Sequence, residues 1–207
     1  MTDERRGPAV VGLVLAAGGG SRYGRPKALV ADSQGPWLER AVRVLRSGGC
    51  GQVHVVLGAA AESAEPLVGG LAGVSIVVAS DWHRGMSASL LAGLDAVAAT
   101  DADAVVITLV DLPDLEAAVV ARLLDSLGVA PHAVGRAAYQ GRPGHPVLLG
   151  REHWTAVAAD CSGDRGARDF LDRIGAPLVE CGDLASGRDV DIPARRRQPA
   201  AADGRDG

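Results

Sequence analysis

Glycines and basic side chains are concentrated in residues 15–27, which read Leu-Ala-Ala-Gly-Gly-Gly-Ser-Arg-Tyr-Gly-Arg-Pro-Lys. Glycine lets backbone N–H groups come close to a ligand and adopt positive φ angles. A concave row of N–H groups beside fixed positive charge suits a phosphate group. Arg22 and Lys27 supply such charge, so this stretch, which we call the glycine loop, predicts a phosphate-binding site.

The glycine loop does not follow two common nucleotide-binding patterns. A dinucleotide-binding G-x-G-x-x-G pattern would need glycine at its last position, where this chain has Tyr23. A Walker A loop needs lysine directly after its last glycine, whereas Arg25 and Pro26 stand there. The loop therefore disfavours a dinucleotide-dependent oxidoreductase. Lys27 is the only lysine in the chain, either by chance or because a compact point charge is needed there.

Three aspartates have the chemistry of metal ligands. Asp111 follows an apolar run from 104 to 110 that reads as a buried strand, and Mg²⁺ prefers oxygen ligands. Asp189 and Asp191 are two residues apart, which puts both on one face of an extended segment. The alternatives are a capping or turn role for Asp111 and a solvated turn for the other pair.

Two further polar segments suggest anion binding. His145 lies between Gly144 and Pro146, which predicts a shaped loop over 140–146. A lone histidine is more often structural, but Arg142 in the same loop suits a phosphate or carboxylate. Residues 163–168 bring arginines close to a predicted helix start, where backbone N–H groups favour anions. The alternative for this second segment is ordinary helix capping with surface arginines.

The elements that must position these residues alternate between apolar strands and amphipathic helices. Short continuous apolar runs predict buried strands, and apolar residues at i, i+3 and i+4 predict helices. The strands are expected at 10–17, 53–57, 74–79 and 104–110. The helices are expected around 38–45, 60–68, 90–97 and 119–127. This alternation predicts a mainly parallel sheet with helices on both faces and ligands at the carboxyl ends of the strands.

The second half of the chain is less regular. Strands are expected at 133–139, 147–149 and 178–181, with an extended piece at 190–192. Helices are expected at 151–159 and 167–174. Ser87 and Asp164 are expected to cap the helices that follow them, because short polar side chains accept hydrogen bonds from the first helical N–H groups.

Length and composition place further bounds on the protein. With 207 residues, a single domain over 9–193 is expected, flanked by a flexible N-terminus (1–8) and a disordered tail (194–207). A net charge of −4 gives no electrostatic case for nucleic acid, and no apolar run is long enough to span a membrane. Three cysteines without C-x-x-C spacing and a polar N-terminus without a secretory signal predict a cytoplasmic protein.

Six segments, taken in order, resemble the signature motifs of the MobA-like nucleotidyltransferases, and most of all those of the molybdenum cofactor cytidylyltransferases. The segments are Leu15–Gly18 with Arg22, Gly24, Pro26 and Lys27, then 85–90, 111–113, 141–146, 163–168 and 189–193. The resemblance spans residues 9–193. It implies a Rossmann-like three-layer α/β/α nucleotidyltransferase fold with a mainly parallel sheet. It also implies Mg²⁺-dependent transfer of CMP from CTP to the phosphate of molybdopterin, with release of pyrophosphate.

The resemblance also implies roles for individual residues. Catalytic roles are expected for Arg22, Lys27 and Asp111. Nucleotide binding is expected for Leu15, Ala16, Ala17, Gly18, Gly19, Arg22, Lys27, Gly85, Met86, Ser87 and Ser89. Binding of the molybdopterin substrate is expected for Arg142, Gly144, His145, Pro146, Asp164 and Arg168. Asp111, together with Asp189 or Asp191, is expected to hold Mg²⁺.

Base choice is inferred from the glycine loop, where the guanylyltransferase relatives typically carry Leu-Ala-Gly-Gly. Here Ala17 replaces the first of those glycines, and its methyl group would leave less room for a purine. The chain departs from the family at Ile192 and over 194–196, where threonine and acidic residues are usual. The alternatives are a related transferase using GTP, a sugar phosphate or an alcohol phosphate, or a non-catalytic accessory protein of a molybdoenzyme. Either a molybdoenzyme or its maturation chaperone is a possible protein partner.

Overall fold

The computed structural model describes residues 9–191. The predicted flexible N-terminus (1–8), the predicted tail (194–207) and the end of the last motif, Ile192 and Pro193, lie outside the described residues. Within them, no helix is long and apolar enough to cross a membrane.

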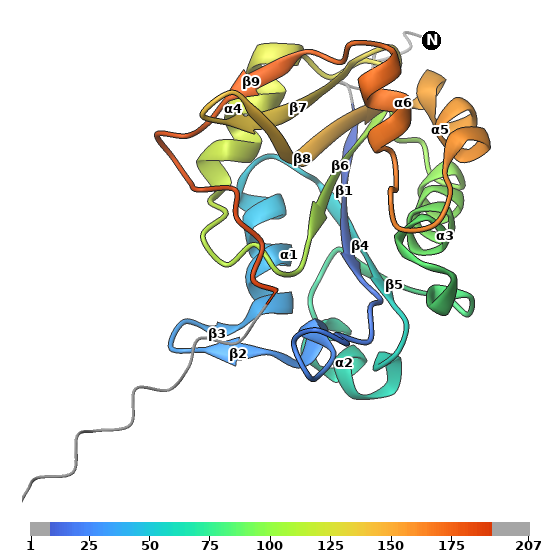
Figure 1. The fold of residues 1–207 in the computed structure, drawn as a ribbon, viewed down its shortest axis with the longest axis vertical. Helices are drawn as coiled ribbons and strands as arrows, with labels where there is room; N and C mark the ends of the chain where they lie inside the picture. The colour runs from blue at the N-terminus through green and yellow to red at the C-terminus, as the bar shows by residue number, and fades with distance from the viewer. Residues whose placement is uncertain (1–8, 192–207) are drawn as a thin grey trace, which may run out of the picture.

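A seven-stranded sheet runs through the molecule in the order β5-β4-β1-β6-β8-β7-β9 (Figure 1). Its strands are β1 (Val10–Ala16), β4 (Gln52–Leu57), β5 (Val74–Val78), β6 (Ala104–Leu109), β7 (Val134–Tyr139), β8 (Arg142–Gly150) and β9 (Leu178–Glu180). β5, β4, β1 and β6 are parallel, β8 is antiparallel to both β6 and β7, and β9 is parallel to β7. The predicted mainly parallel sheet is confirmed.

Helices cover both faces of this sheet (Figure 1). They are α1 (Trp37–Ser47), α2 (Ala61–Val68), α3 (Met86–Ala98), α4 (Ala117–Leu127), α5 (Trp154–Asp160) and α6 (Arg168–Arg173). Successive side chains of β1 point to opposite faces of the sheet, which gives two layers of helices. Val14 packs in the cluster with α1, α2 and α4. Leu13 packs in the cluster with α3, α5 and α6. Both side chains are fully buried, and burial of each contributes about 1.5–3 kcal/mol.

The prediction of a loop over 140–146 is wrong for most of that range. Only Gln140 and Gly141 form a turn, and β8 begins at Arg142. The prolines at 143 and 146 misled the prediction because proline lacks the N–H that a central strand needs. This half of β8 pairs with β7 alone, since β6 pairs with β8 only from Val147 onward.

The two predicted helix caps are also wrong. Gly85, with φ of 108°, occupies the cap position of α3, and Ser87 lies buried in the first turn. Asp164 does not cap α6, whose cap position is Ala167 without a side-chain hydrogen bond. Instead, Oδ1 of Asp164 accepts the N–H of Met86 at 3.2 Å, so it serves the start of α3. A residue distant in sequence therefore supplies the cap.

Two other segments differ from expectation. A small hairpin, β2 (Ala31–Asp32) and β3 (Gly35–Pro36), lies between the glycine loop and α1. It is too short for a periodic pattern and is held through the Asp32 side chain, which accepts hydrogen bonds from Trp37 and Arg40. Residues 189–191 form no strand, although their carboxylates still converge.

Candidate functional site

The glycine loop leaves the carboxyl end of β1 and folds back on itself. The N–H of Gly24 donates to the carbonyl of Gly20 at 2.8 Å, which closes the turn. Gly20 has φ of 68°, and a Cβ there would lie 1.8 Å from the carbonyl oxygen of Arg25. Only glycine fits this approach. The turn delivers Lys27 to the edge of the sheet as the first residue of a 3-10 helix, η1 (Lys27–Leu29).

Lys27 points at two of the predicted metal ligands. Its Nζ donates to Oδ2 of Asp111 at 2.5 Å and to Oδ1 of Asp191 at 2.9 Å. Burial disfavours the charged ammonium, but these two hydrogen bonds and the carboxylate charges outweigh it and raise the pKa of Lys27. The hydrogen bond from Lys27 in turn lowers the pKa of Asp191. Arg22, which is exposed, adds a second ion pair to Asp191 at 3.2 Å.

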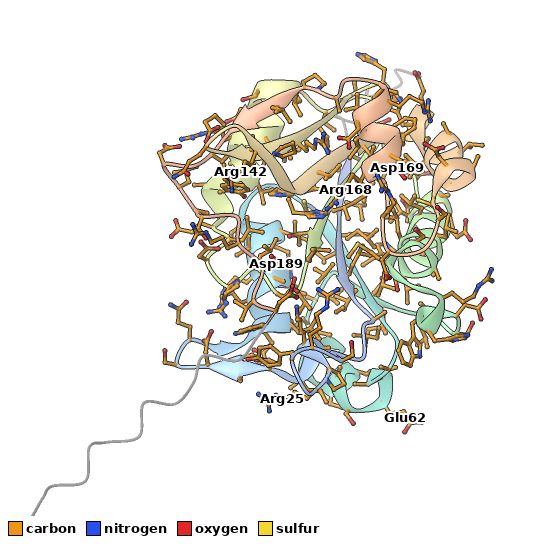
Figure 2. The ribbon with its side chains drawn as sticks, in the orientation of Figure 1. Arg25, Glu62, Arg142, Arg168, Asp169 and Asp189 are labelled. Carbon is orange, nitrogen blue, oxygen red and sulfur yellow. The ribbon has the colours of Figure 1, made fainter. Side chains whose placement is uncertain are left out.

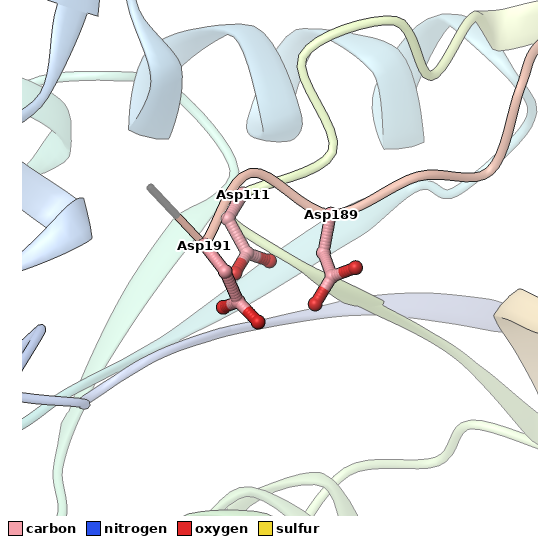
Figure 3. A group of neighbouring side chains, drawn as sticks. All are labelled: Asp111, Asp189 and Asp191. Atoms are coloured by element: carbon pink, nitrogen blue, oxygen red, sulfur yellow. The ribbon is translucent and has the colours of Figure 1, made fainter. Parts of the chain in front are cut away.

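Asp111, Asp189 and Asp191 form a cluster in which one carboxylate oxygen from each lies within 4.8 Å of the others (Figure 3). Asp111 is buried at the end of β6, and its Oδ1 has no hydrogen-bond partner among residues 9–191. A buried acceptor without a partner is costly. Oxygen donors of this kind fit a hard divalent cation such as Mg²⁺. We call these three residues the carboxylate cluster.

The segment 182–191, which we call the C-terminal segment, carries two members of the carboxylate cluster across the sheet edge. The N–H of Ser186 donates to Oδ2 of Asp114 at 2.7 Å. The N–H of Val190 donates to the carbonyl of Asp111 at 3.1 Å. Gly187 has φ of 64°, and a Cβ there would lie 2.1 Å from Cδ2 of Tyr139. These contacts fix where the two carboxylates meet the third.

A pocket of about 280 Å³, which we call the central pocket, opens beside the carboxylate cluster. Its lining includes Ile107, Leu109, Val147 and Arg136 from the sheet, Met86 and Leu90 from α3, and residues 164–168. Asp189 belongs to this lining as well as to the carboxylate cluster. The central pocket therefore adjoins the proposed metal position.

The central pocket also contains the His145 side chain. Burial lowers the pKa of His145. The hydrogen bond to the Ile107 carbonyl and the Asp111 charge oppose this shift, and the charges of Arg168 and Arg136 add to it. Nδ1 lies 3.4 Å from the carbonyl of Ile107. The hydroxyl of Tyr139 donates to the His145 carbonyl at 2.6 Å. His145 is thus placed as a polar wall of the pocket.

The predicted site residues divide into those that converge and those that do not. Lys27, Arg22 and the three aspartates converge through ion pairs and short carboxylate separations. Leu15, Met86, Gly144, His145, Asp164 and Arg168 line the central pocket. Arg142 does not line it and is exposed next to the β7–β8 turn (Figure 2).

The remaining predicted nucleotide-binding residues lie around the start of α3 and the glycine loop. Ala16, Ala17 and Ser89 are buried, and Ala17 packs in the cluster beneath α3. Gly18 has open space around it, and a Cβ on Gly19 would lie 3.3 Å from the Trp82 ring. The N–H groups of Met86 and Ser87 are already taken by Asp164 and Gly163. Pro146 is buried within β8.

Sequence reasoning missed three residues that the structure brings to the site: Arg136, Gly187 and Asp114. A signal existed for Arg136, since it is an arginine inside an otherwise apolar strand pattern. No local pattern marks Gly187 or Asp114, because each acts on a segment distant in sequence.

The chain belongs to the MobA-like NTP transferase domain family, which matches residues 12–178. It is 41% identical over 194 residues to nicotine blue oxidoreductase of Paenarthrobacter nicotinovorans, a match that covers 89% of this chain and 93% of that protein. It is 32% identical over 150 residues to molybdenum cofactor guanylyltransferase of Rhodobacter capsulatus, covering 72% of this chain and 67% of that protein.

Solved structures share this fold. Rv0371c of Mycobacterium tuberculosis H37Rv superposes with a TM-score of 0.73 at 28% identity, covering 90% of this chain and 95% of the other. A structure of Rv0371c in complex with manganese gives a TM-score of 0.67 at 27% identity, covering 84% and 87%. A nucleotidyl transferase from Methanothermobacter gives a TM-score of 0.72 at 22% identity, covering 90% and 93%. The Rossmann-like nucleotidyltransferase fold expected from the sequence is thereby confirmed, and manganese is present in one Rv0371c structure.

Proposed function

We propose that this nucleotidyltransferase is Mg²⁺-dependent and transfers CMP from CTP to the phosphate of molybdopterin, releasing pyrophosphate. The observation that carries the proposal is the meeting of the glycine loop, Lys27 and the carboxylate cluster at one edge of the sheet. Transfer between two polyanions needs alignment and charge neutralisation. It needs no side-chain nucleophile, since the acceptor phosphate is already anionic.

Each part of the site has a role in this reaction. Asp111, with Asp189 or Asp191, holds Mg²⁺, which supplies neutralisation of the phosphate charge. The backbone of residues 15–19 binds the base and the phosphates. Arg22 and Lys27 move from the carboxylates to the triphosphate when nucleotide enters. The acceptor occupies the central pocket next to Asp189.

The preference for CTP rests on the resemblance at Ala17. Its methyl group is buried in the cluster beneath α3, so it acts on the base through the packing of the glycine loop. The variant Ala17→Gly is expected to gain activity with GTP relative to CTP. A variant with an unchanged ratio of the two activities would exclude Ala17 as the determinant.

The test is pyrophosphate release from CTP and GTP, with Mg²⁺, in the presence and absence of molybdopterin. Release that needs both CTP and molybdopterin supports the proposal. Asp111→Asn is expected to abolish release, whereas Asp125→Asn, an exposed aspartate on α4, is a matched control. Turnover only with another base or acceptor indicates a related transferase. Binding without any turnover indicates an accessory protein.

A second candidate function is an oxidoreductase activity, and the observation that favours it is the 41% identity to a protein named nicotine blue oxidoreductase. Against it stands the glycine loop, which lacks the dinucleotide-binding pattern. The same purified protein can be assayed for reduction of nicotine blue by NADH or NADPH. Reduction without pyrophosphate release from any triphosphate would replace the transferase proposal.

A further inference from the structure

Arg136 places a charged side chain in the floor of the central pocket. It lies on β7 opposite Val147, which in turn lies opposite Ile107 of β6, so all three share one face of the sheet. Its side chain is only 11% exposed, and Asp172 of α6 is its carboxylate partner. The Nε of Arg136 is buried and has no acceptor within residues 9–191. The guanidinium therefore retains hydrogen-bonding capacity that the described part of the chain does not use.

Arg168 brings a second guanidinium to the same pocket. It is exposed at the start of α6, lines the pocket, and makes no ion pair with any residue in the described range. Arg168 and Asp189, both labelled in Figure 2, line the same pocket. Both guanidinium charges are close enough to depress the pKa of His145. The two arginines therefore act on one region of the pocket.

The carboxylate cluster explains why such charge is needed. Asp189 lies at the boundary between the cluster and the central pocket. An anionic acceptor that enters the pocket meets carboxylates that repel it. Apolar walls, formed among others by Ile107, Leu109 and Leu90, offer nothing to offset that repulsion. The cations within the lining are Arg136, Arg165 and Arg168. Arg165 is paired with the nearby Asp169, which leaves Arg136 and Arg168 as the side chains that can attract the anion.

We infer that Arg136 and Arg168 clamp the anionic oxygen group of the acceptor, while the apolar walls of the central pocket pack against the apolar part of its body. This inference rests on the proposed function, because it takes the central pocket as the acceptor site. Arg136 is a newly assigned binding residue. The clamp holds the acceptor oxygens beside Asp189, at the edge of the carboxylate cluster.

Isothermal titration calorimetry with simple probes tests the clamp without the natural acceptor. The probes are 1-naphthyl phosphate, 1-naphthoate and the neutral 1-naphthalenemethanol. The wild type is expected to bind at least one of the two anions more tightly than the alcohol, and the tighter anion identifies the class of acceptor group. Arg168→Gln and Arg136→Lys are each expected to weaken that binding at least tenfold. Arg173→Gln, on α6 but paired with Asp160 outside the pocket, is the control and should bind like the wild type.

The outcomes separate this inference from the proposed function. Asp111→Asn should lose pyrophosphate release but keep the binding of the anionic probe, because the clamp does not use that carboxylate. If Arg136→Lys does not fold, Arg168→Gln alone decides. Equal binding of the alcohol and the anions would overturn the inference, as would no binding of either anion to the wild type. Unchanged anion affinity in Arg168→Gln or in a folded Arg136→Lys would also overturn it.

Discussion

Replacing Lys27 with methionine is expected to tighten the binding of Mn²⁺ to the nucleotide-free protein. The Nζ of Lys27 lies 2.5 Å from Asp111 and 2.9 Å from Asp191, so it occupies the side of the carboxylate cluster where a divalent cation would bind. Its raised pKa keeps it charged. A metal ion must therefore displace the ammonium before it can use both carboxylates. Methionine keeps the length of the side chain and removes the charge.

The magnitude follows from the repulsion between the two cations. If the ammonium retreats to roughly 8 Å, its repulsion with a divalent ion is about 1–4 kcal/mol at an effective dielectric constant between roughly 20 and 80. Because about 1.4 kcal/mol is a factor of ten, the variant should bind Mn²⁺ about fivefold more tightly or better. The metal-free variant should also lose about 1–3 kcal/mol of stability, since two carboxylates lose a shared donor.

The assay is titration of Mn²⁺ followed by electron paramagnetic resonance of the free ion. Arg25→Met is the matched control, because Arg25 belongs to the same loop and is exposed. Figure 2 shows Arg25 at the outer edge of the molecule, away from Asp189. The control removes one charge from the loop without touching the cluster and should change the affinity less than threefold, as expected for a screened charge.

Either of two results would refute the reasoning. Unchanged or weaker Mn²⁺ binding in the methionine variant would mean that Lys27 does not compete with the metal. An equal gain in Arg25→Met would mean that the effect reflects the overall charge of the glycine loop. Binding of the nucleoside triphosphate provides a separate readout, because loss of Lys27 should weaken CTP binding while it strengthens binding of the metal alone.

Three further predictions concern other parts of the molecule. Gly187→Ala should weaken Mn²⁺ binding at least tenfold, because its Cβ would collide with Tyr139 and displace the segment that carries Asp189 and Asp191. The control Gly175→Ala has a similar φ of 61° but no atom near its Cβ, and it should leave Mn²⁺ binding unchanged. His54→Leu should reduce the loss of stability below pH 6.5 in acid titrations of unfolding. Burial lowers the pKa of His54, so the unfolded state binds more protons there, which costs at most about 1.4 kcal/mol per pH unit; an unchanged pH slope would contradict this. Arg151→Met should cost about 2–3 kcal/mol in urea unfolding, because its guanidinium binds three backbone carbonyls around the end of α3; a loss below about 0.5 kcal/mol would contradict it.

The sequence predicts the first half of the fold well because its signals are local. The continuous apolar run of β1 and the helical spacing of Leu38, Ala41 and Leu45 in α1 reflect burial on one or two faces. The sequence also places the glycine loop and Asp111 after strands, and hence at one edge of a parallel sheet. That the acidic residues near the C-terminus meet Asp111 follows from no local signal. Their meeting with Asp111 depends on the path of the C-terminal segment, which crosses the edge of the sheet.

Prediction failed where the deciding partner is distant in sequence. Asp164 has the composition of a cap for the helix that follows it, but its carboxylate accepts the N–H of Met86, 78 residues away. The prolines of β8 indicated a loop, yet the strand forms because β6 does not pair with that half. Aspartate does cap a helix, and proline does avoid the paired side of a strand. Contacts distant in sequence decide which helix is capped and which half of the strand is left unpaired.

The C-terminal segment links the two halves of the candidate site. Gly187 and Asp189 line the central pocket, while Asp189 and Asp191 belong to the carboxylate cluster. A displacement of this segment therefore alters metal binding and the shape of the pocket together. It is attached through the N–H groups of Ser186 and Val190 and the contact of Gly187 with Tyr139. Ion pairs of Asp183 with Arg122, and of Asp191 with Lys27 and Arg22, attach it as well. Metal binding to the two carboxylates adds a further attachment, so we expect the metal and the acceptor each to favour binding of the other.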